Sequence, residues 1–178
     1  MSQKAPDMKP LPFLWDFSIN YTAGSIAEII YKARCCLRGD KQITYRDFDP
    51  KLLYAPVVRH ETIIVFIVKA LAQGLIVKGA DVDKAYGNIN DGTIMIMEQP
   101  TDSSDILAVP GHACEIKKSL YGLKQAGEIW GQVIHQKFIQ WGFQQSNQDQ
   151  RLYFYQSGTI FINLIFVIDD MAYSSNDW

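Results

Sequence analysis

Two adjacent carboxylates, Asp169 and Asp170, are the residues most capable of chemistry, and they directly follow the apolar run 159–168. Like charges near a buried strand repel, by about 4 kcal/mol at about 4 Å and an effective dielectric constant near 20. A bound divalent cation would offset this repulsion. The alternative is a solvated β-turn, because aspartate is a common turn residue.

Several segments are expected to position this pair. Apolar and aromatic residues at 151–156 and 161–168, separated by Ser157-Gly158, predict two strands joined by a hairpin. Further strands are expected at residues 29–37, 75–82, 93–98 and 171–174. Helical spacing of apolar residues predicts helices at 61–71 and 128–141, each followed by a glycine. For 61–71 a strand is the alternative, because the segment is rich in β-branched residues.

This order of elements predicts an α+β fold, in which helices cover one face of an antiparallel sheet. Residues 1–30 show no clear period, and their prolines favour an extended start. Residues 44–57 and 99–112 have the composition of loops.

Composition narrows the class of protein. The chain has 178 residues, of which 48% are hydrophobic and 20% charged, as in ordinary globular domains. Its apolar runs are too short to cross a bilayer, and the first residues lack a secretory signal pattern, so no membrane partner is expected. Three cysteines do not make a disulfide framework or a zinc site, which is typical of an intracellular protein.

Charge is unevenly distributed along the chain. The net charge is −2, but residues 30–60 hold seven lysines and arginines against three aspartates. A basic patch near an acidic centre suits a polyanion held beside metal ions. A solvated charged surface is the alternative.

Six motifs, taken in order, resemble the reverse transcriptase of copia-type LTR retrotransposons. The most specific is KSLYGLKQA at 118–126, followed by Trp130. The others are YKAR at 31–34, YAPVVR at 54–59, ADVDKAY at 80–86, MEQP at 97–100 and VIDDM at 167–171. The resemblance covers residues 24–178, and it implies a polymerase palm-like sheet with a partial fingers subdomain.

The resemblance implies RNA-directed DNA polymerase activity with two magnesium ions, or manganese in their place. The implied catalytic and metal-binding carboxylates are Asp81, Asp169 and Asp170, with the backbone carbonyl of Val82 as a further ligand. Carboxylate oxygens are the hard ligands that magnesium prefers.

The resemblance also implies residues that bind the incoming nucleotide. Lys32 and Arg34 are candidates to grip the triphosphate, with Arg38 as a substitute. Tyr86 matches the position of an aromatic ring under the sugar, and its alternative is a core aromatic. Gln125 matches the position of a glutamine that approaches nucleotide and template.

The sequence also departs from the family pattern. Val167 replaces the usual tyrosine, Gly127 replaces a usual proline, and the segment after Tyr86 is shorter than in related elements. Residues 1–23 are unassigned, 24–60 are expected to form partial fingers, and 61–178 a palm that lacks its C-terminal part, the thumb and RNase H. The expectation is therefore a truncated or degenerate copy with little activity alone.

The implied partners are an RNA or DNA template-primer and deoxynucleoside triphosphates. Self-association is expected through a sheet edge exposed by truncation. The implied location is the cytoplasm, within a virus-like particle, or the nucleus. The alternative function is a non-catalytic palm-fold remnant that binds nucleic acid or nucleotide, or a structural fragment.

Overall fold

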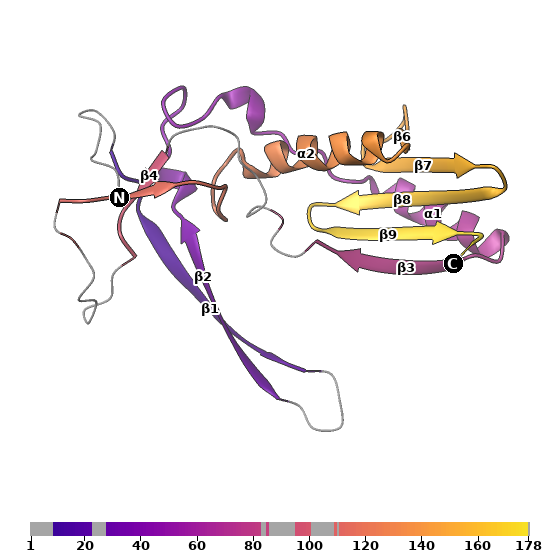
Figure 1. The fold of residues 1–178 in the computed structure, drawn as a ribbon, viewed down its shortest axis with the longest axis horizontal. Helices are drawn as coiled ribbons and strands as arrows, with labels where there is room; N and C mark the ends of the chain where they lie inside the picture. The colour runs from indigo at the N-terminus through magenta and orange to yellow at the C-terminus, as the bar shows by residue number, and fades with distance from the viewer. Residues whose placement is uncertain are drawn as a thin grey trace. The chain divides into compact units, whose positions relative to one another are not determined.

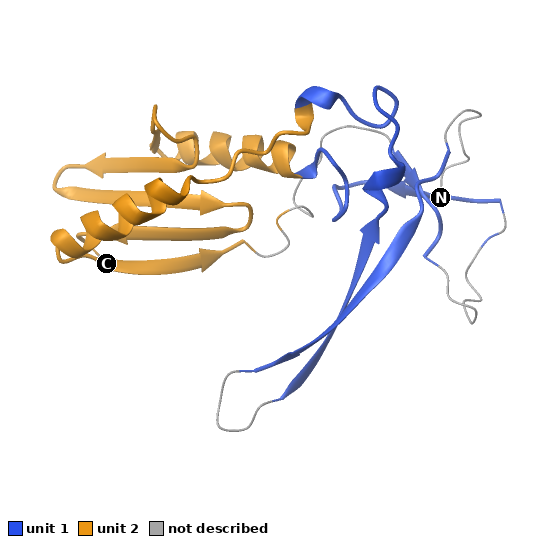
Figure 2. Ribbon diagram, turned by 180° about the vertical axis from the view of Figure 1, so that it is seen from behind, with its two compact units in different colours: residues 1–51, 86–126 blue, residues 52–85, 127–178 orange. Residues whose placement is uncertain are grey.

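The computed structural model describes residues 9–22, 28–82, 85, 95–100, 109 and 111–177. The chain forms two compact units (Figure 2): the first comprises residues 1–51 and 86–126, and the second comprises residues 52–85 and 127–178. Each unit has its own sheets and its own buried residues. Helices together with antiparallel strands confirm the α+β class.

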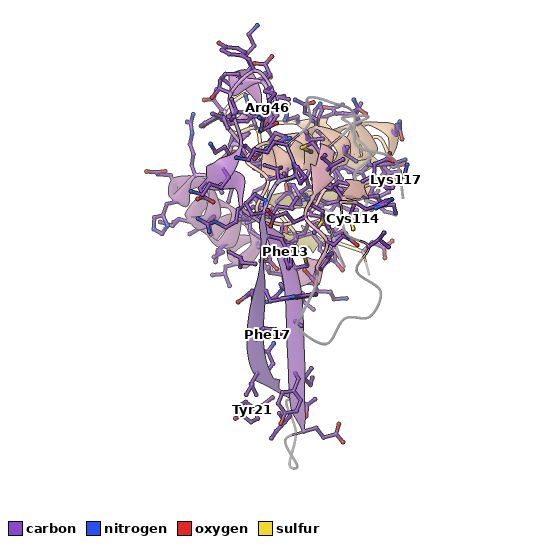
Figure 3. All side chains as sticks on the ribbon, turned by 90° about the vertical axis from the view of Figure 1, so that its left-hand side faces the viewer. Phe13, Phe17, Tyr21, Arg46, Cys114 and Lys117 are labelled. Atoms are coloured by element: carbon purple, nitrogen blue, oxygen red, sulfur yellow. The ribbon has the colours of Figure 1, made fainter. Side chains whose placement is uncertain are left out.

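A long antiparallel hairpin dominates the first unit. It is formed by β1 (Phe13–Tyr21) and β2 (Ile29–Leu37), with register from Phe13↔Leu37 to Tyr21↔Ile29. Strand β2 was predicted, but β1 was not. The strand signal was nevertheless present, because apolar and polar side chains alternate strictly over residues 15–21 (WDFSINY). The prolines before it had favoured an extended start without a defined period. Figure 3 shows Phe13 near the base of this hairpin and Tyr21 near its tip.

The hairpin base joins a small hydrophobic core. There, β4 (Met95–Met97) pairs antiparallel with β5 (Cys114–Ile116), and Leu11 forms a parallel bridge with Met97. The predicted strand at 93–98 is confirmed at 95–97, but it belongs to this separate two-stranded sheet. Within the predicted loop 99–112, residues 101–108 and 110 lie outside the described residues. The buried cluster consists of Leu11, Leu37, Met95, Met97, Ile116, Leu123 and Ala126.

Two short 3-10 turns, Gly39–Lys41 and Pro50–Leu52, follow the hairpin in the sequence. Residues 42–59 otherwise contain no helix or longer strand, which agrees with the loop predicted at 44–57.

The second unit contains a five-stranded sheet in which every neighbouring pair is antiparallel (Figure 1). The order across the sheet is β3-β9-β8-β7-β6. The predicted hairpin and final strand are confirmed, and Gly158, at φ +58°, lies in the predicted turn. The strands are β3 (Ile76–Asp81), β6 (Gln144–Gln145), β7 (Leu152–Ser157), β8 (Ile160–Val167) and β9 (Asp170–Ser175).

Two helices pack on this sheet, as their apolar periodicity predicted. Helix α1 (His60–Ala72) and helix α2 (Ala126–Gln140) are each followed within two residues by a glycine of positive φ, Gly74 and Gly142. The helix predicted at 61–71 is therefore confirmed, and the strand alternative is wrong. Within the described residues, no helix is long and apolar enough to span a membrane.

The helices contact opposite faces of the sheet, so the expectation that both cover one face is wrong. Phe138 of α2 packs against Tyr153 of β7, with ring centroids 4.8 Å apart. Lys69 of α1 donates to Asn163 of β8 at 2.9 Å and lies over the ring of Phe154. Because Tyr153 and Phe154 are consecutive in one strand, their side chains point to opposite faces. Figure 2 shows α1 in front of the strands.

A buried carboxylate joins the start of α1 to the strand region. Asp149 Oδ2 accepts hydrogen bonds from the Arg59 N–H at 2.9 Å and the Thr62 hydroxyl at 2.6 Å, and Oδ1 accepts from the Arg151 N–H at 2.8 Å. Asp149 thus satisfies backbone and side-chain donors at the N-terminus of α1, whose N-cap residue Arg59 lies 90 residues earlier in the sequence.

Candidate active site

The backbones of the predicted catalytic residues lie at one end of the sheet of the second unit, where the edge strand β3 ends and β9 begins. Asp81 is the last residue of β3 and Asp170 the first of β9, and the two are cross-strand partners. The Val82 N–H donates to the Asp169 carbonyl at 2.9 Å, which extends the ladder by one step. Asp81 and the adjacent pair Asp169-Asp170, which are far apart in sequence, therefore have neighbouring backbones at one end of the sheet.

The exposure of this cluster suits ion binding from solvent. Asp81 and Asp170 are exposed, and Asp169 is partly exposed. Carboxylates directly opposite each other on antiparallel strands destabilise the pair unless a cation compensates them. Carboxylate oxygens are the donor type that a hard cation such as magnesium prefers. Among the described residues, however, no three His, Cys, Asp or Glu side chains are grouped closely enough to hold a metal ion.

The turn that carries Asp169 has an unusual backbone. The Val167↔Asp170 pairing leaves Ile168 and Asp169 as a two-residue loop between β8 and β9. Ile168 has φ +57°, a conformation that β-branched residues rarely adopt. Its carbonyl accepts a hydrogen bond from the indole N–H of Trp130 on α2. The sequence identified Trp130 as part of a motif and of a helical stripe, but nothing in it indicated this contact.

In the first unit, Lys32 and Arg34 lie on β2, two residues apart, and therefore share a face of the hairpin. Both are exposed, and Arg34 lies 3.4 Å from Asp16 of β1 in a solvent-accessible ion pair. The same hairpin exposes large apolar and aromatic side chains, including Phe17, Tyr21 and Tyr31.

Arg38, the substitute candidate, is engaged by a neighbour. Its Nε and Nη2 donate to the two carboxylate oxygens of Asp40, at 2.8 and 2.7 Å. This bidentate hydrogen bonding lowers the pKa of Asp40 to about 2. Arg38 is therefore already paired at the surface.

Gln125 is buried in the first unit, where only 2% of its surface is exposed. Its Oε1 accepts from Gln42 Nε2 at 3.0 Å, and its Nε2 donates to the Asp47 carbonyl at 3.3 Å. Gln42 in turn accepts from the Lys124 N–H at 2.8 Å. Contact with a nucleotide stays a prediction for Gln125, and its side chain already joins two chain segments. Tyr86 lies outside the described residues.

Comparison with known proteins identifies the family. The family model described as "Reverse transcriptase (RNA-dependent DNA polymerase)" matches residues 1–178. The chain belongs to this reverse transcriptase family, and the resemblance to copia-type retrotransposons is confirmed.

Its relatives include retrotransposon polyproteins of plants. It is 28% identical over 166 residues to the Retrovirus-related Pol polyprotein from transposon RE1 of Arabidopsis thaliana, covering 92% of this chain and 11% of that protein. It is 29% identical over 170 residues to the corresponding polyprotein from transposon TNT 1-94 of Nicotiana tabacum, covering 95% of this chain and 12% of that protein. The chain thus spans about a tenth of these relatives. No solved structure matches it.

Proposed function

We propose that this chain carries the carboxylate centre of an RNA-directed DNA polymerase, which extends a DNA primer on an RNA or DNA template. The observation that carries the proposal is the β3–β9 register, because it places Asp81 opposite Asp170. The next residue of the chain, Val82, donates its N–H to the Asp169 carbonyl, so Asp169 is held beside the same pair. Family membership and this arrangement of acidic residues support the same reaction class.

In this proposal Asp81, Asp169 and Asp170, with the Val82 carbonyl, hold magnesium or manganese. When bound, such ions neutralise charge on the transferring phosphoryl group and activate the primer hydroxyl. The three carboxylates supply oxygen ligands, and the sheet fixes the strand ends from which they project. The five-stranded sheet and its helices act as the palm, with residues 24–60 as partial fingers.

The nucleotide and the template-primer are proposed to contact other groups of the chain. Lys32 and Arg34 provide positive charge for a triphosphate, and Tyr86 and Gln125 keep the roles that the family motifs imply. Tyr31, an exposed aromatic residue next to Lys32 in the sequence, favours nucleic-acid contact. Nucleobases stack on aromatic rings, while lysine and arginine side chains pair with phosphates. The proposed location is a cytoplasmic virus-like particle or the nucleus.

One observation favours a second candidate, a non-catalytic module that binds nucleic acid or nucleotide. Among the described residues no three acidic side chains are grouped for a metal, so the carboxylates of such a module would not act in catalysis. The basic and aromatic side chains of the β1–β2 hairpin would still bind nucleic acid or nucleotide.

Primer extension separates the two candidates. The reaction contains an RNA template, a DNA primer, magnesium and four deoxynucleotides, and it is run with the parent chain, Asp81→Asn and the exposed-site control Asp177→Asn. We expect extension by the parent and the control, and its loss in Asp81→Asn. Template binding without extension, equal in all three proteins, would favour the binding module.

A further inference from the structure

The loop Ile168-Asp169 is the feature that carries a further inference. In two-residue hairpins a type I′ turn has positive φ at both loop residues, whereas type II′ has it only at the first. Ile168 has φ +57°, and Asp169 is not among the residues of positive φ, so the loop follows the type II′ pattern. Type II′ turns normally carry glycine at the first position, and here an isoleucine occupies it.

The amino acids of this loop do not favour the conformation that it adopts. A non-glycine residue in a sparsely populated region costs about 1–3 kcal/mol and persists only where the surroundings enforce it. Aspartate tolerates positive φ well, which makes type I′ an accessible competitor for Ile168-Asp169. The two turn types differ by rotation of the peptide group between the loop residues. That peptide group consists of the Ile168 carbonyl and the Asp169 N–H.

Trp130 holds this peptide group. Its indole N–H donates to the Ile168 carbonyl, and the Trp130 side chain is only 3% exposed. The Trp130 ring lies 6.4 Å from that of Phe166 on β8, and Phe138 on the same helix packs edge-on against Phe166 at 5.9 Å. The indole donor is thus anchored to the strand that leads into the loop. On its other side, the Asp169 carbonyl is held by the Val82 N–H at 2.9 Å.

We propose that Trp130 is a positioning residue, whose indole N–H selects the type II′ orientation of the Ile168-Asp169 peptide and so fixes the direction in which the Asp169 carboxylate projects. This inference rests on the proposed function in one respect, which is that the Asp169 carboxylate binds a metal ion. The orientation of the peptide is a property of the metal-free protein and can be measured without activity.

The test uses three variants and one control. Trp130→Phe keeps an aromatic ring and removes the N–H. Ile168→Gly supplies the residue that type II′ turns prefer. The double variant Trp130→Phe/Ile168→Gly should therefore keep the type II′ turn without the indole hydrogen bond. The control is Trp141→Phe, because Trp141 contacts the same Phe138 but is 60% exposed.

The first measurement is the Asp169 backbone amide signal in ¹⁵N-resolved NMR spectra of the metal-free proteins. We expect it to shift or broaden in Trp130→Phe relative to the parent. The double variant is compared with Ile168→Gly, because the residue at 168 itself affects the Asp169 amide, and we expect these two proteins to give nearly the same signal. The second measurement is the magnesium concentration that half-saturates thermal stabilisation. We expect that midpoint to rise about tenfold or more in Trp130→Phe, as for other groups that orient metal ligands, and to be restored by glycine at 168.

The outcomes are distinct. An unchanged Asp169 amide in Trp130→Phe overturns the inference. So does a double variant whose Asp169 amide differs from that of Ile168→Gly as much as that of Trp130→Phe differs from the parent, because a merely structural tryptophan would give that result. If Trp130→Phe does not fold, Ile168→Gly alone decides: a gain in stability supports the inference, and a loss of stability overturns it. Absence of any magnesium response in the parent counts against the proposed function, while the amide measurement still tests Trp130.

Discussion

Asp81 and Asp170 are directly opposite each other in the last register pair between β3 and β9. Like charges in this position destabilise an antiparallel pair. The same juxtaposition that suits a metal site is therefore a source of instability when no cation is bound.

We expect Asp170→Asn to raise the free energy of unfolding of the metal-free protein by about 0.2–1 kcal/mol, because it removes this cross-strand repulsion. Urea denaturation in the presence of a chelator measures the change. The stabilisation that magnesium gives should fall in the same variant. Asp177→Asn, at an exposed site near the end of the chain, is the control and should change neither quantity. A loss of stability in Asp170→Asn would show that Asp170 is a satisfied structural group.

A second prediction concerns Asp149 and pH. Burial raises its pKa, but hydrogen bonds from the Thr62 hydroxyl and the Arg59 and Arg151 N–H groups outweigh burial, so the pKa lies below its ordinary value. Asp149→Asn should lower the free energy of unfolding at neutral pH by about 1–3 kcal/mol, because it weakens charge-assisted hydrogen bonds to partly buried donors.

The pH dependence of this effect follows from the sign of the shift. A carboxylate whose folded-state pKa is depressed stabilises the fold above its unfolded pKa, near about 3.9. That contribution is lost as pH falls through the folded pKa. The stability difference between the parent and Asp149→Asn should therefore shrink below about pH 4, in urea titrations at several pH values. A difference that stays constant down to the acid transition would contradict this account.

A third prediction tests the packing between α2 and the buried Arg151. A Cβ added at Gly131 would collide with the Arg151 guanidinium, which is 5% exposed and held by its Nε–H donating to the Pro56 carbonyl at 2.7 Å. Gly131→Ala should therefore lower stability by about 1–3 kcal/mol, despite the better helix propensity of alanine. Gly79→Ala is the control, because its Cβ would meet only the Met171 carbonyl at 3.8 Å. A stabilised Gly131→Ala protein would mean that Arg151 moves freely.

A fourth prediction concerns Gln42 and Gln125, which hydrogen-bond each other inside the first unit. Alanine at either position leaves the partner amide unsatisfied, so each single variant should lose about 1–3 kcal/mol. The double variant should lose less than the sum, with a coupling of about 0.5–3 kcal/mol. Gln136→Ala, at an exposed site on α2, is the control. Unchanged stability in Gln125→Ala, with a raised KM for deoxynucleotides, would instead favour a purely substrate-binding role.

A fifth prediction concerns self-association through β3. This strand pairs with β9 on one side, and no strand of the described residues pairs with its other side. Ile76 and Val77 in β3 are exposed. Unpaired edges of this kind add strands from other chains, so sedimentation velocity should show concentration-dependent association that Val77→Lys suppresses. Val65→Lys, at an exposed apolar site on α1, should leave it unchanged. A monomer at high concentration would contradict the prediction.

Local patterns predicted the elements whose amphipathic faces are buried. The turn at Ser157-Gly158 and the stripe that includes Trp130 and Phe138 on α2 are examples, because apolar periodicity and turn chemistry are local properties. The β1 strand was not predicted, although apolar and polar residues alternate over residues 15–21 and this alternation is a local strand signal. The opposite placement of α1 and α2 depends on how the strands are ordered, which no local period encodes.

The site was predictable to a similar degree. The motifs named Asp81, Asp169 and Asp170, and the register of the sheet brings their backbones together. The burial of Gln125 was not predictable, because its partner Gln42 lies 83 positions away in the sequence. The bond from Trp130 to Ile168 likewise depends on the packing of a helix against a turn.

The six-residue ladder between β3 and β9 has a consequence for folding. Side chains alternate between faces along a strand, so a slip of one residue would place Ala80 opposite Asp170 and turn Asp81 to the other face. A cation that needs both carboxylates would bind only the correctly aligned pair. Such a ligand would therefore stabilise the native strand register over a slipped one, and chains that fold in its presence would more often adopt the native pairing.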